Sequence, residues 1–445
     1  MNPRIVTSSA KNPVDRVVEF LSRPAFDPTA EKVAAELLAD IRARGNKAVL
    51  DAVFSLRESL DTVFARVTCY SLDTKRLRYY SYKYSKEELA EAEKAVPEDV
   101  KRNVQEAHRR VSAFAKAGMR PDWSIDTPHG GKLGERFLPL DRVGVYIPGG
   151  TAPLASTSIM TATLAQVAGV PEIVAVTPCA KDGSVNPVLL YALVIAGATE
   201  IYRVGGIQGV GLIAYGTETV KPVQKIVGPG GAYVTAAKRL VYGNVSLDQV
   251  AGPSEICVVA DDTANPAWVA ADLLSQIEHG TGKEKALLTT DSMALAEAVD
   301  AEVLKQLEIC SRRDRMAPMV LIVVTPTIEE AADLASDFAP EHLEVLTEDP
   351  NSLLPHLKAA GAIFVGPWAP EPAGDFAAGP SHVLPTGGAA AKFSGLTVED
   401  FRRRTSIIEY TKEDLEEAMP VIETFGAIEG LDAHTRSATI RMGRL

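Results

Sequence analysis

The sequence contains little cysteine. Its four cysteines, Cys69, Cys179, Cys257 and Cys310, lie far apart among 445 residues and form no C-x-x-C pair. This spacing predicts neither a disulfide framework nor a cysteine-based zinc site. We therefore expect reduced, mostly buried thiols and a cytoplasmic protein.

The chain also lacks an excess of basic residues and any long apolar run. Lysine and arginine number 46 against 58 aspartates and glutamates, which gives a net charge of -12. An acidic chain is not expected to bind nucleic acid through a broad basic face. The sequence has no run of about 18 apolar residues, so we expect no membrane span. It has no charged start followed by an apolar run, so we expect no secretory signal.

One local stretch, residues 57–84, departs from this acidic background. It holds five of the 12 tyrosines, Tyr70, Tyr79, Tyr80, Tyr82 and Tyr84, among several lysines and arginines. A basic aromatic stretch can bind single-stranded nucleic acid. Because the stretch is short and its surroundings are acidic, we favour a surface hairpin or insertion.

The length of the chain predicts two or more domains. Before residue 136 the pattern is mainly helical, with helices expected over 30–52, broken at Gly45-Asn46, and over 85–117. After it, β-branched runs alternate with helical stretches, which predicts βαβ units and parallel sheets. The expected strands are 143–147, 172–177, 200–204, 225–227, 256–260, 286–290, 319–324 and 362–365, and the helices are 156–168, 187–196, 209–214, 233–242, 266–279, 294–307 and 328–338.

We therefore expect an α/β fold with two Rossmann-like parallel-sheet domains, a helical N-terminal segment and a C-terminal tail. The predicted division is an N-terminal arm over 1–29, a first α/β domain over 30–142 and 254–396, a second, nucleotide-binding-like α/β domain over 143–253, and a helical tail over 397–445. Residues 368–397 have almost no periodicity, and a loop of that length usually carries function. The tail has too few apolar residues for its own core, so we expect it to pack on another subunit.

Glycine clusters follow three expected strands of the second domain. They are Pro148-Gly149-Gly150, Gly205-Gly206 and Gly228-Pro229-Gly230-Gly231. Ligands of parallel sheets bind outside the carboxyl ends of strands, where backbone N–H groups and helix N-termini face phosphates. None of the clusters is a G-x-G-x-x-G fingerprint, and tight turns need glycine anyway. Three in succession nevertheless favour a nucleotide site.

Gln276 and His279 lie in the last turn of an expected helix. Asn265 suits its N-cap, Pro266 its first position and Gly280 its stop. Residues three apart share one helix face, so an amide oxygen and an imidazole nitrogen could hold half of a metal site there. The alternative is an ordinary helix end.

Further polar clusters lie downstream. Glu341-His342 places a carboxylate beside an imidazole, which suits general-base chemistry, although a surface pair is the alternative. Asp375 and His382 lie in the long loop, and Glu429 and His434 lie near the C-terminus.

These clusters contain the donors that a zinc ion requires. Gln276, His279, Asp375 and His434 would supply nitrogen and oxygen ligands. No local spacing such as H-E-x-x-H joins them, so the pattern alone does not select this set.

At the level of whole blocks the sequence resembles the histidinol dehydrogenases. The resemblance runs from about residue 30 to the C-terminus, except in the Tyr-rich stretch. The matching blocks are 145–150, 204–206, 225–230, 251–255, 276–280, 339–344, 374–375, 382–386, 394–396 and 429–434.

The resemblance implies a zinc-containing, NAD-dependent homodimer that oxidises L-histidinol to L-histidine through histidinal, at the end of histidine biosynthesis. It implies one zinc per subunit, held by Gln276, His279, Asp375 and His434, with His434 supplied by the partner so that the active sites are shared. It implies that His342 removes the alcohol proton and that Glu341 activates water for the second oxidation. The implied substrate contacts are Ser254, Gln276, His279, His342, Asp375, His382, Glu429 and His434, and the implied NAD contacts are Tyr146, Gln208 and Gly231.

Three positions depart from the family pattern. Gly231 replaces an asparagine that contacts NAD, Ile277 replaces an alanine, and Ala369-Pro370-Glu371-Pro372 replaces Ser-Pro-Glu-Ser. These changes suggest an altered grip on the cofactor. A relative that oxidises another amino alcohol or a diol, and a non-enzymatic zinc-stabilised scaffold, remain the alternatives.

Overall fold

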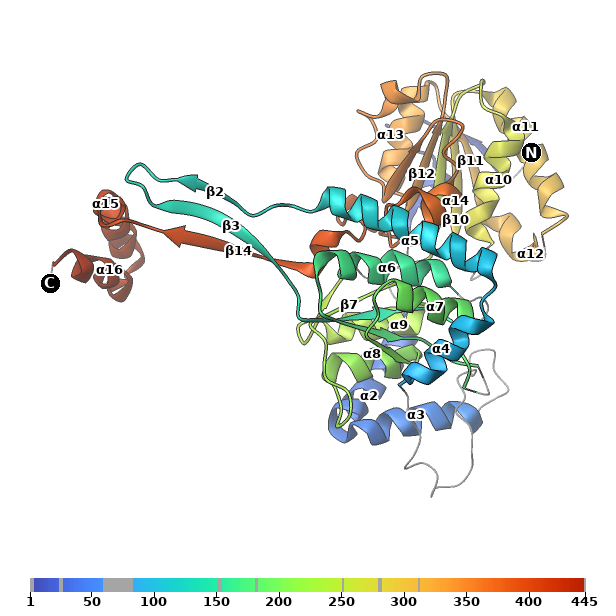
Figure 1. Cartoon of the computed structure of the whole chain (residues 1–445). Helices are drawn as coiled ribbons and strands as arrows, with labels where there is room; N and C mark the ends of the chain where they lie inside the picture. The colour runs from blue at the N-terminus through green and yellow to red at the C-terminus, as the bar shows by residue number, and fades with distance from the viewer. Residues whose placement is uncertain are drawn as a thin grey trace.

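A computed structural model describes residues 4–23, 27–58, 83–149, 154–180, 183–249, 252–278, 282–310 and 313–443. Its body holds two parallel sheets flanked by helices, and a ribbon with two helices projects from it (Figure 1). Within the described residues no helix has both the length and the apolar character needed to cross a membrane. The Tyr-rich prediction falls largely on 59–82, outside these residues.

The five-stranded sheet has the order β6-β5-β4-β7-β8. Its strands are β4 (Arg142–Tyr146), β5 (Glu172–Val176), β6 (Glu200–Tyr202), β7 (Lys225–Val227) and β8 (Ser246–Leu247). All neighbours are parallel, with Val143 opposite Ile173 and Lys225. Every residue of β4 is buried, because helices cover both faces of the sheet.

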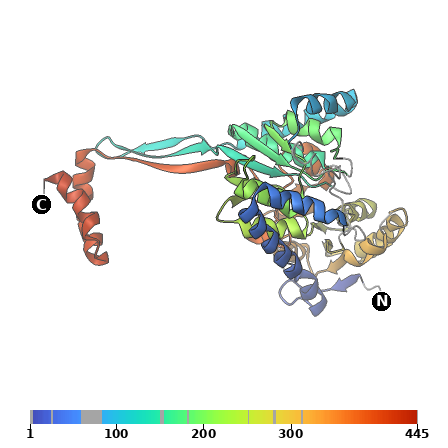
Figure 2. The ribbon, with the colours of Figure 1, turned by 90° about the horizontal axis from the view of Figure 1, so that it is seen from below.

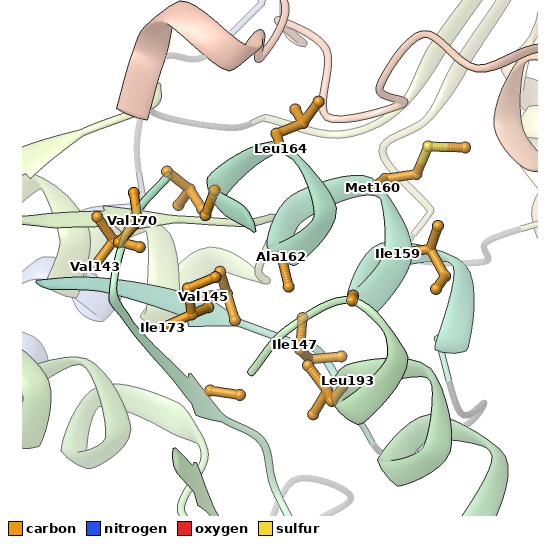
Figure 3. Close-up of a cluster of buried hydrophobic side chains, with 14 of the residues drawn as sticks. Val143, Val145, Ile147, Ile159, Met160, Ala162, Leu164, Val170, Ile173 and Leu193 are labelled. Atoms are coloured by element: carbon orange, nitrogen blue, oxygen red, sulfur yellow. The ribbon is translucent and has the colours of Figure 1, made fainter. Parts of the chain in front are cut away.

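Helices α6 (Ala155–Ala168), α7 (Pro187–Ile195), α8 (Gly206–Tyr215) and α9 (Ala232–Val241) connect or follow these strands. Figure 3 shows α6 over the sheet, with Ile159, Ala162 and Leu164 near Val145 and Ile173. Asn186 caps α7 through the Val188 N–H, and Pro187 occupies the first helical position.

The six-stranded sheet has the order β1-β11-β10-β9-β12-β13 and is also parallel throughout. Its strands are β1 (Ile5–Thr7), β9 (Glu255–Ala260), β10 (Lys285–Thr290), β11 (Val320–Val324), β12 (His342–Leu346) and β13 (Ala362–Val365). Helices α10 (Pro266–Ile277), α11 (Met293–Leu307), α12 (Arg313–Met316) and α13 (Ile328–Phe338) belong to this half. The predicted α/β class with two parallel sheets is therefore confirmed.

The N-terminal half adds helices to both sheets. They are α1 (Asp15–Leu21), α2 (Pro28–Arg44), α3 (Asn46–Glu58), α4 (Lys86–Ala95) and α5 (Glu98–Gly118). Gly45, with a φ of 55°, ends α2 at the predicted break. The contacts differ from the predicted division, because α2 packs on α8 and α9 of the five-stranded half and β1 joins the six-stranded sheet.

A three-stranded antiparallel ribbon, β14-β3-β2, leaves the body with two helices at its tip (Figure 2). Its elements are β2 (Trp123–Asp126), β3 (Lys132–Pro139), β14 (Arg402–Glu409), α15 (Lys412–Glu429) and α16 (Asp432–Thr439). We call these five elements the projection. The prediction of a wholly helical tail was wrong, because β14 pairs with β3 over eight residues. All of β2 and most of β14 is exposed, and β14 shows no alternation of apolar and polar residues.

Candidate functional site

The site residues of the body gather where its two halves meet. His342 begins β12, and Gln276 lies in the last turn of α10. His382 links the halves, because one ring nitrogen, Nδ1, donates to the Asp375 carbonyl (3.1 Å) and the other, Nε2, lies 3.3 Å from Thr157 Oγ1 on α6. The amino edge of the six-stranded sheet therefore faces the helix N-termini of the five-stranded sheet.

Glu341 and His342 are both buried, 7% and 2% exposed, so they are not a surface pair. The Glu255 N–H donates to Glu341 Oε2 (3.3 Å), and His342 Nδ1 donates to the Glu255 carbonyl (3.4 Å). A carbonyl oxygen only accepts hydrogen bonds, so Nδ1 carries a hydrogen. The other ring nitrogen, His342 Nε2, is left to face the site.

Burial raises the pKa of Glu341 to about 8, an effect that the charge of Asp375 reinforces. Burial alone would lower the pKa of His342, but the nearby charge of Glu341 and the hydrogen bond and charge of Asp375 outweigh it and raise that pKa to about 9. Two groups with such shifts in one enclosed place are typical of an acid–base site.

Asp375 lies on a π-helical turn, Gly374–Ala378, directly after the short helix α14 (Glu371–Ala373). Asp375 Oδ1 lies 3.4 Å from His342 Nε2, and Glu371 Oε1 lies 3.8 Å from the same nitrogen. Although burial opposes ionisation of Asp375, its hydrogen bond to His342 and the charge of His382 lower its pKa. Asp375 therefore presents a negative charge to the site.

Glu371 is an additional site carboxylate that sequence reasoning did not assign. Ser275 Oγ donates to its Oε2 (3.2 Å), and its N–H donates to Glu344 Oε1 (2.7 Å). Burial and the charge of Asp375 raise the pKa of Glu371 to about 7. The signal was its place four residues before Asp375, but only the folded helical turn brings both carboxylates to His342.

The buried polar atoms here are suited to a cation. His342, Glu371 and Asp375 each offer a ligand atom within 4.8 Å of one another. Among the described residues, Gln276 Oε1 and Glu371 Oε1 are buried without a hydrogen-bond partner, whereas His342 Nε2 has Asp375 Oδ1 at 3.4 Å. Buried polar atoms are normally paired, so Gln276 Oε1 and the Asp375 charge fit a bound metal ion. His279 lies outside the described residues.

Ile277, the bulkier residue at the helix end, points away from these donors. It is 1% exposed and belongs to the apolar cluster between α10 and the six-stranded sheet, with Leu273 and Leu274. The larger side chain therefore fills the core behind the helix, while Gln276 remains at the site.

The glycine clusters lie at the carboxyl ends of β4, β6 and β7, as the pattern of parallel sheets requires. Gly205 and Gly231, the N-cap residues of α8 and α9, offer no capping side chain. In α8 the Gly206 N–H donates to the Tyr146 hydroxyl instead. A Cβ added to Gly231 would meet no atom within 4 Å, so the open start of α9 suits a phosphate of a dinucleotide.

Tyr146 and Gln208 lie beside these helix starts and are buried, at 4% and 2% exposed. The Tyr146 hydroxyl accepts a hydrogen bond from the Gly206 N–H (2.9 Å). Ser254 lies in the turn before β9, and its carbonyl accepts from Lys285 N–H (3.2 Å). Their predicted contacts with NAD and substrate stay predictions.

Glu429 and His434 lie on the projection, far from Gln276 and Asp375 of the same chain (Figures 1 and 2). Both side chains are exposed. Helices α15 and α16 pack so closely that a Cβ on Gly426 would lie 1.7 Å from Thr435 Oγ1. The helix pair thus fixes His434 on a tip that presents it outward.

The chain is similar to proteins of one kind along nearly its whole length. The sequence profile described as Histidinol dehydrogenase matches residues 22–442. The chain is 42% identical to the histidinol dehydrogenase of Heliobacterium mobile over 428 residues, which cover 95% of this chain and 96% of the relative. It is 42% identical to that of Bacillus subtilis (strain 168) over 418 residues, 93% of each chain.

A solved structure shares the fold. The crystal structure of histidinol dehydrogenase from Elizabethkingia anophelis superposes with a TM-score of 0.89 at 31% identity. The match covers 99% of this chain and 98% of the other. The likeness therefore extends over both sheets and the projection.

Proposed function

The chain belongs to the histidinol dehydrogenase family and is an oxidoreductase, and from this premise we propose that it oxidises L-histidinol to L-histidine with zinc and NAD. The proposal rests on one enclosed group of residues, Glu341, His342, Glu371, Asp375 and Gln276. This group combines two candidate proton acceptors, Glu341 and His342, with oxygen atoms that could bind a metal ion.

Zinc would be held by Gln276, His279 and Asp375 of one chain and by His434 of the partner subunit. When bound, zinc would supply positive charge that fixes the nitrogen donors of an amino alcohol. The donors fit, because Gln276 Oε1 is buried without a partner and Asp375 keeps its charge. The exposed position of His434 on a projection supports a homodimer with shared sites.

NAD would bind against the starts of α8 and α9, near Tyr146, Gln208 and Gly231, and accept hydride. Because Gly231 has no side chain, backbone groups would hold the cofactor there. The first oxidation needs neutral His342, whose Nε2 takes the hydroxyl proton as hydride leaves the carbon that bears that hydroxyl. With a pKa of about 9, the neutral imidazole prevails only above that pH. The second oxidation needs the ionised Glu341 carboxylate, which prevails above its pKa of about 8, to take a proton from water that attacks the aldehyde.

The contacts of the two residues support this division of tasks. His342 Nε2 faces Asp375 and Glu371, while the Glu255 N–H stabilises the ionised form of Glu341. Ser254 and His382 of the same chain, together with Glu429 of the partner subunit, would orient the substrate. The buried thiols of Cys179 and Cys257, neither of them in a disulfide, suit a cytoplasmic enzyme.

The test is to incubate the protein with L-histidinol, zinc and excess NAD and to count NADH against substrate consumed. We expect two NADH per histidinol and histidine as the product, and metal removal should stop the reaction. No NADH formation with zinc and NAD present would refute the proposal. Faster oxidation of an amino alcohol without an imidazole would assign the chain to a relative with another substrate.

A further inference from the structure

Arg23 contacts Glu255 and Phe338, two neighbours of the Glu341–His342 pair. Its guanidinium forms an ion pair with Glu255, and the two side chains are only 13% and 2% exposed. Its Nη2 also donates to the Phe338 carbonyl (2.7 Å), and its guanidinium carbon lies 4.1 Å from the centre of the Phe338 ring. One side chain thus joins the N-terminal segment to β9 and to the end of α13.

Glu255 forms backbone hydrogen bonds with both Glu341 and His342. Its N–H donates to Glu341 and its carbonyl accepts from His342. Its side chain is held on one oxygen by Arg23 and on the other by the Gly388 N–H (3.2 Å). Movement of Glu255 would therefore change the hydrogen bonds of Glu341 and His342 at once.

The second contact of Arg23 lies at the turn that leads into the pair. Ala339 follows Phe338 with a φ of 46°, and it is the non-glycine residue with positive φ in the described part of the chain. Such a backbone conformation needs support from its surroundings. The hydrogen bond from Arg23 holds the Phe338 carbonyl just before this turn, three residues before Glu341.

We propose that Arg23 is a positioning residue that sets the placement of Glu341 and His342 through Glu255 and the Phe338–Ala339 turn. This role rests on the proposed function for its effect on rate. Because small displacements of catalytic groups lower rates steeply while Arg23 contacts no substrate, its loss should lower kcat and leave KM nearly unchanged.

Removing one partner of a buried ion pair also destabilises a protein, so stability and positioning must be separated. We would compare Arg23→Met, Arg23→Lys and the double variant Arg23→Met/Glu255→Gln. The double variant neutralises the charge that Arg23→Met leaves unpaired on Glu255, but it does not restore the contact with Phe338. The matched control is Arg142→Met, since Arg142 is also buried and pairs with Glu172 (2.6 Å) and Glu200 (3.1 Å) in the other sheet.

For Arg23→Met we expect kcat to fall about 10- to 100-fold, with KM and zinc content within about threefold of the wild type. The double variant should regain stability but keep the low kcat. Arg23→Lys should lie between, because a single ammonium cannot reproduce the planar fork. Arg142→Met should lower the melting temperature and leave the kcat of the folded enzyme within about twofold.

Amide hydrogen exchange gives a readout that needs no substrate. Exchange at Ala339, at residues 341–343 and at position 255 should speed up in the double variant, while β4 and β5 stay protected. Unchanged exchange there, or a double variant with wild-type kcat, would overturn the positioning role. If the wild-type protein does not oxidise histidinol, the proposed function fails, and the exchange experiment alone decides the role of Arg23.

Discussion

The body and the projection solve the problem of stability in opposite ways. In the body, β4 and β9 are buried along their whole lengths between helices. In the projection, β2 is exposed throughout, and Ile408, Val421 and Ile428 are 72%, 59% and 74% exposed. A three-stranded ribbon without an apolar core gains little from its own packing. The body therefore has its own apolar core, whereas the projection leaves large apolar side chains exposed.

The predicted site residues divide along the same line. The proposed proton acceptors Glu341 and His342 and the proposed metal ligands Gln276 and Asp375 belong to the body. The proposed ligand His434 belongs to the projection. In our proposal the body alone therefore holds an incomplete site. The largest expected effects come from replacing the proposed base, His342, or the proposed metal ligand on the projection, His434.

Replacing His342 by glutamine should lower kcat about 10²- to 10⁴-fold while zinc stays bound, because the proton acceptor is lost and the metal donors remain. Replacing His434 by glutamine should instead lower the zinc content. Stopped-flow NADH absorbance and metal analysis measure the two effects. His356→Gln is the matched control, because that half-exposed histidine pairs with Asp333 (2.9 Å) away from the site. Equal zinc loss in both site variants would contradict the division.

Core and projection should also differ in stability. Leu193 is fully buried in α7 and is labelled in Figure 3. Its replacement by alanine should lower the free energy of unfolding by about 2–5 kcal/mol. Ile428→Ala should change unfolding of a single chain by less than about 0.5 kcal/mol but weaken dimerisation. Urea denaturation and sedimentation measure these quantities. An Ile428→Ala chain that dimerises as tightly as the wild type would show that this face does not meet a partner.

The smallest expected effect concerns acid. Asp414 lies in the first turn of α15 and accepts hydrogen bonds from the Thr127 hydroxyl (2.7 Å) and the His129 N–H (3.2 Å) across the ribbon turn. Although desolvation opposes it, hydrogen bonds from Thr411 and Thr127 lower its pKa to about 2. Because the folded pKa lies below the unfolded value of about 3.9, this stabilisation is present above pH 4 and is lost as the pH falls towards 2.

Trp123 on β2 can report this change once Trp268 and Trp368 are replaced by phenylalanine. We expect its emission to shift between pH 4 and 2 and the shift to disappear in Asp414→Asn. A shift that persists in that variant would come from another group.

Much of the body was predictable because its strands are short β-branched runs bounded by glycine and by helix caps. Strand β12 was not predicted, since Glu341, His342 and Glu344 at its start are polar and are buried only by tertiary contacts. The ribbon was missed because β2 has only four residues and β14 begins with three arginines and has no apolar alternation. Glu371 and Glu255 escaped notice because their roles depend on neighbours distant in sequence, His342 and Arg23.

The most direct test of the account mixes two inactive chains. An Asp375→Ala chain keeps an intact projection, and a His434→Ala chain keeps an intact body. If each site combines the body of one chain with the projection of its partner, every mixed dimer contains one intact site. After denaturation and joint refolding in equal amounts, half of the dimers are mixed, so histidinol-dependent NADH formation should return to about a quarter of the wild-type rate. No recovered activity from dimers shown to be mixed would contradict a site shared between body and projection.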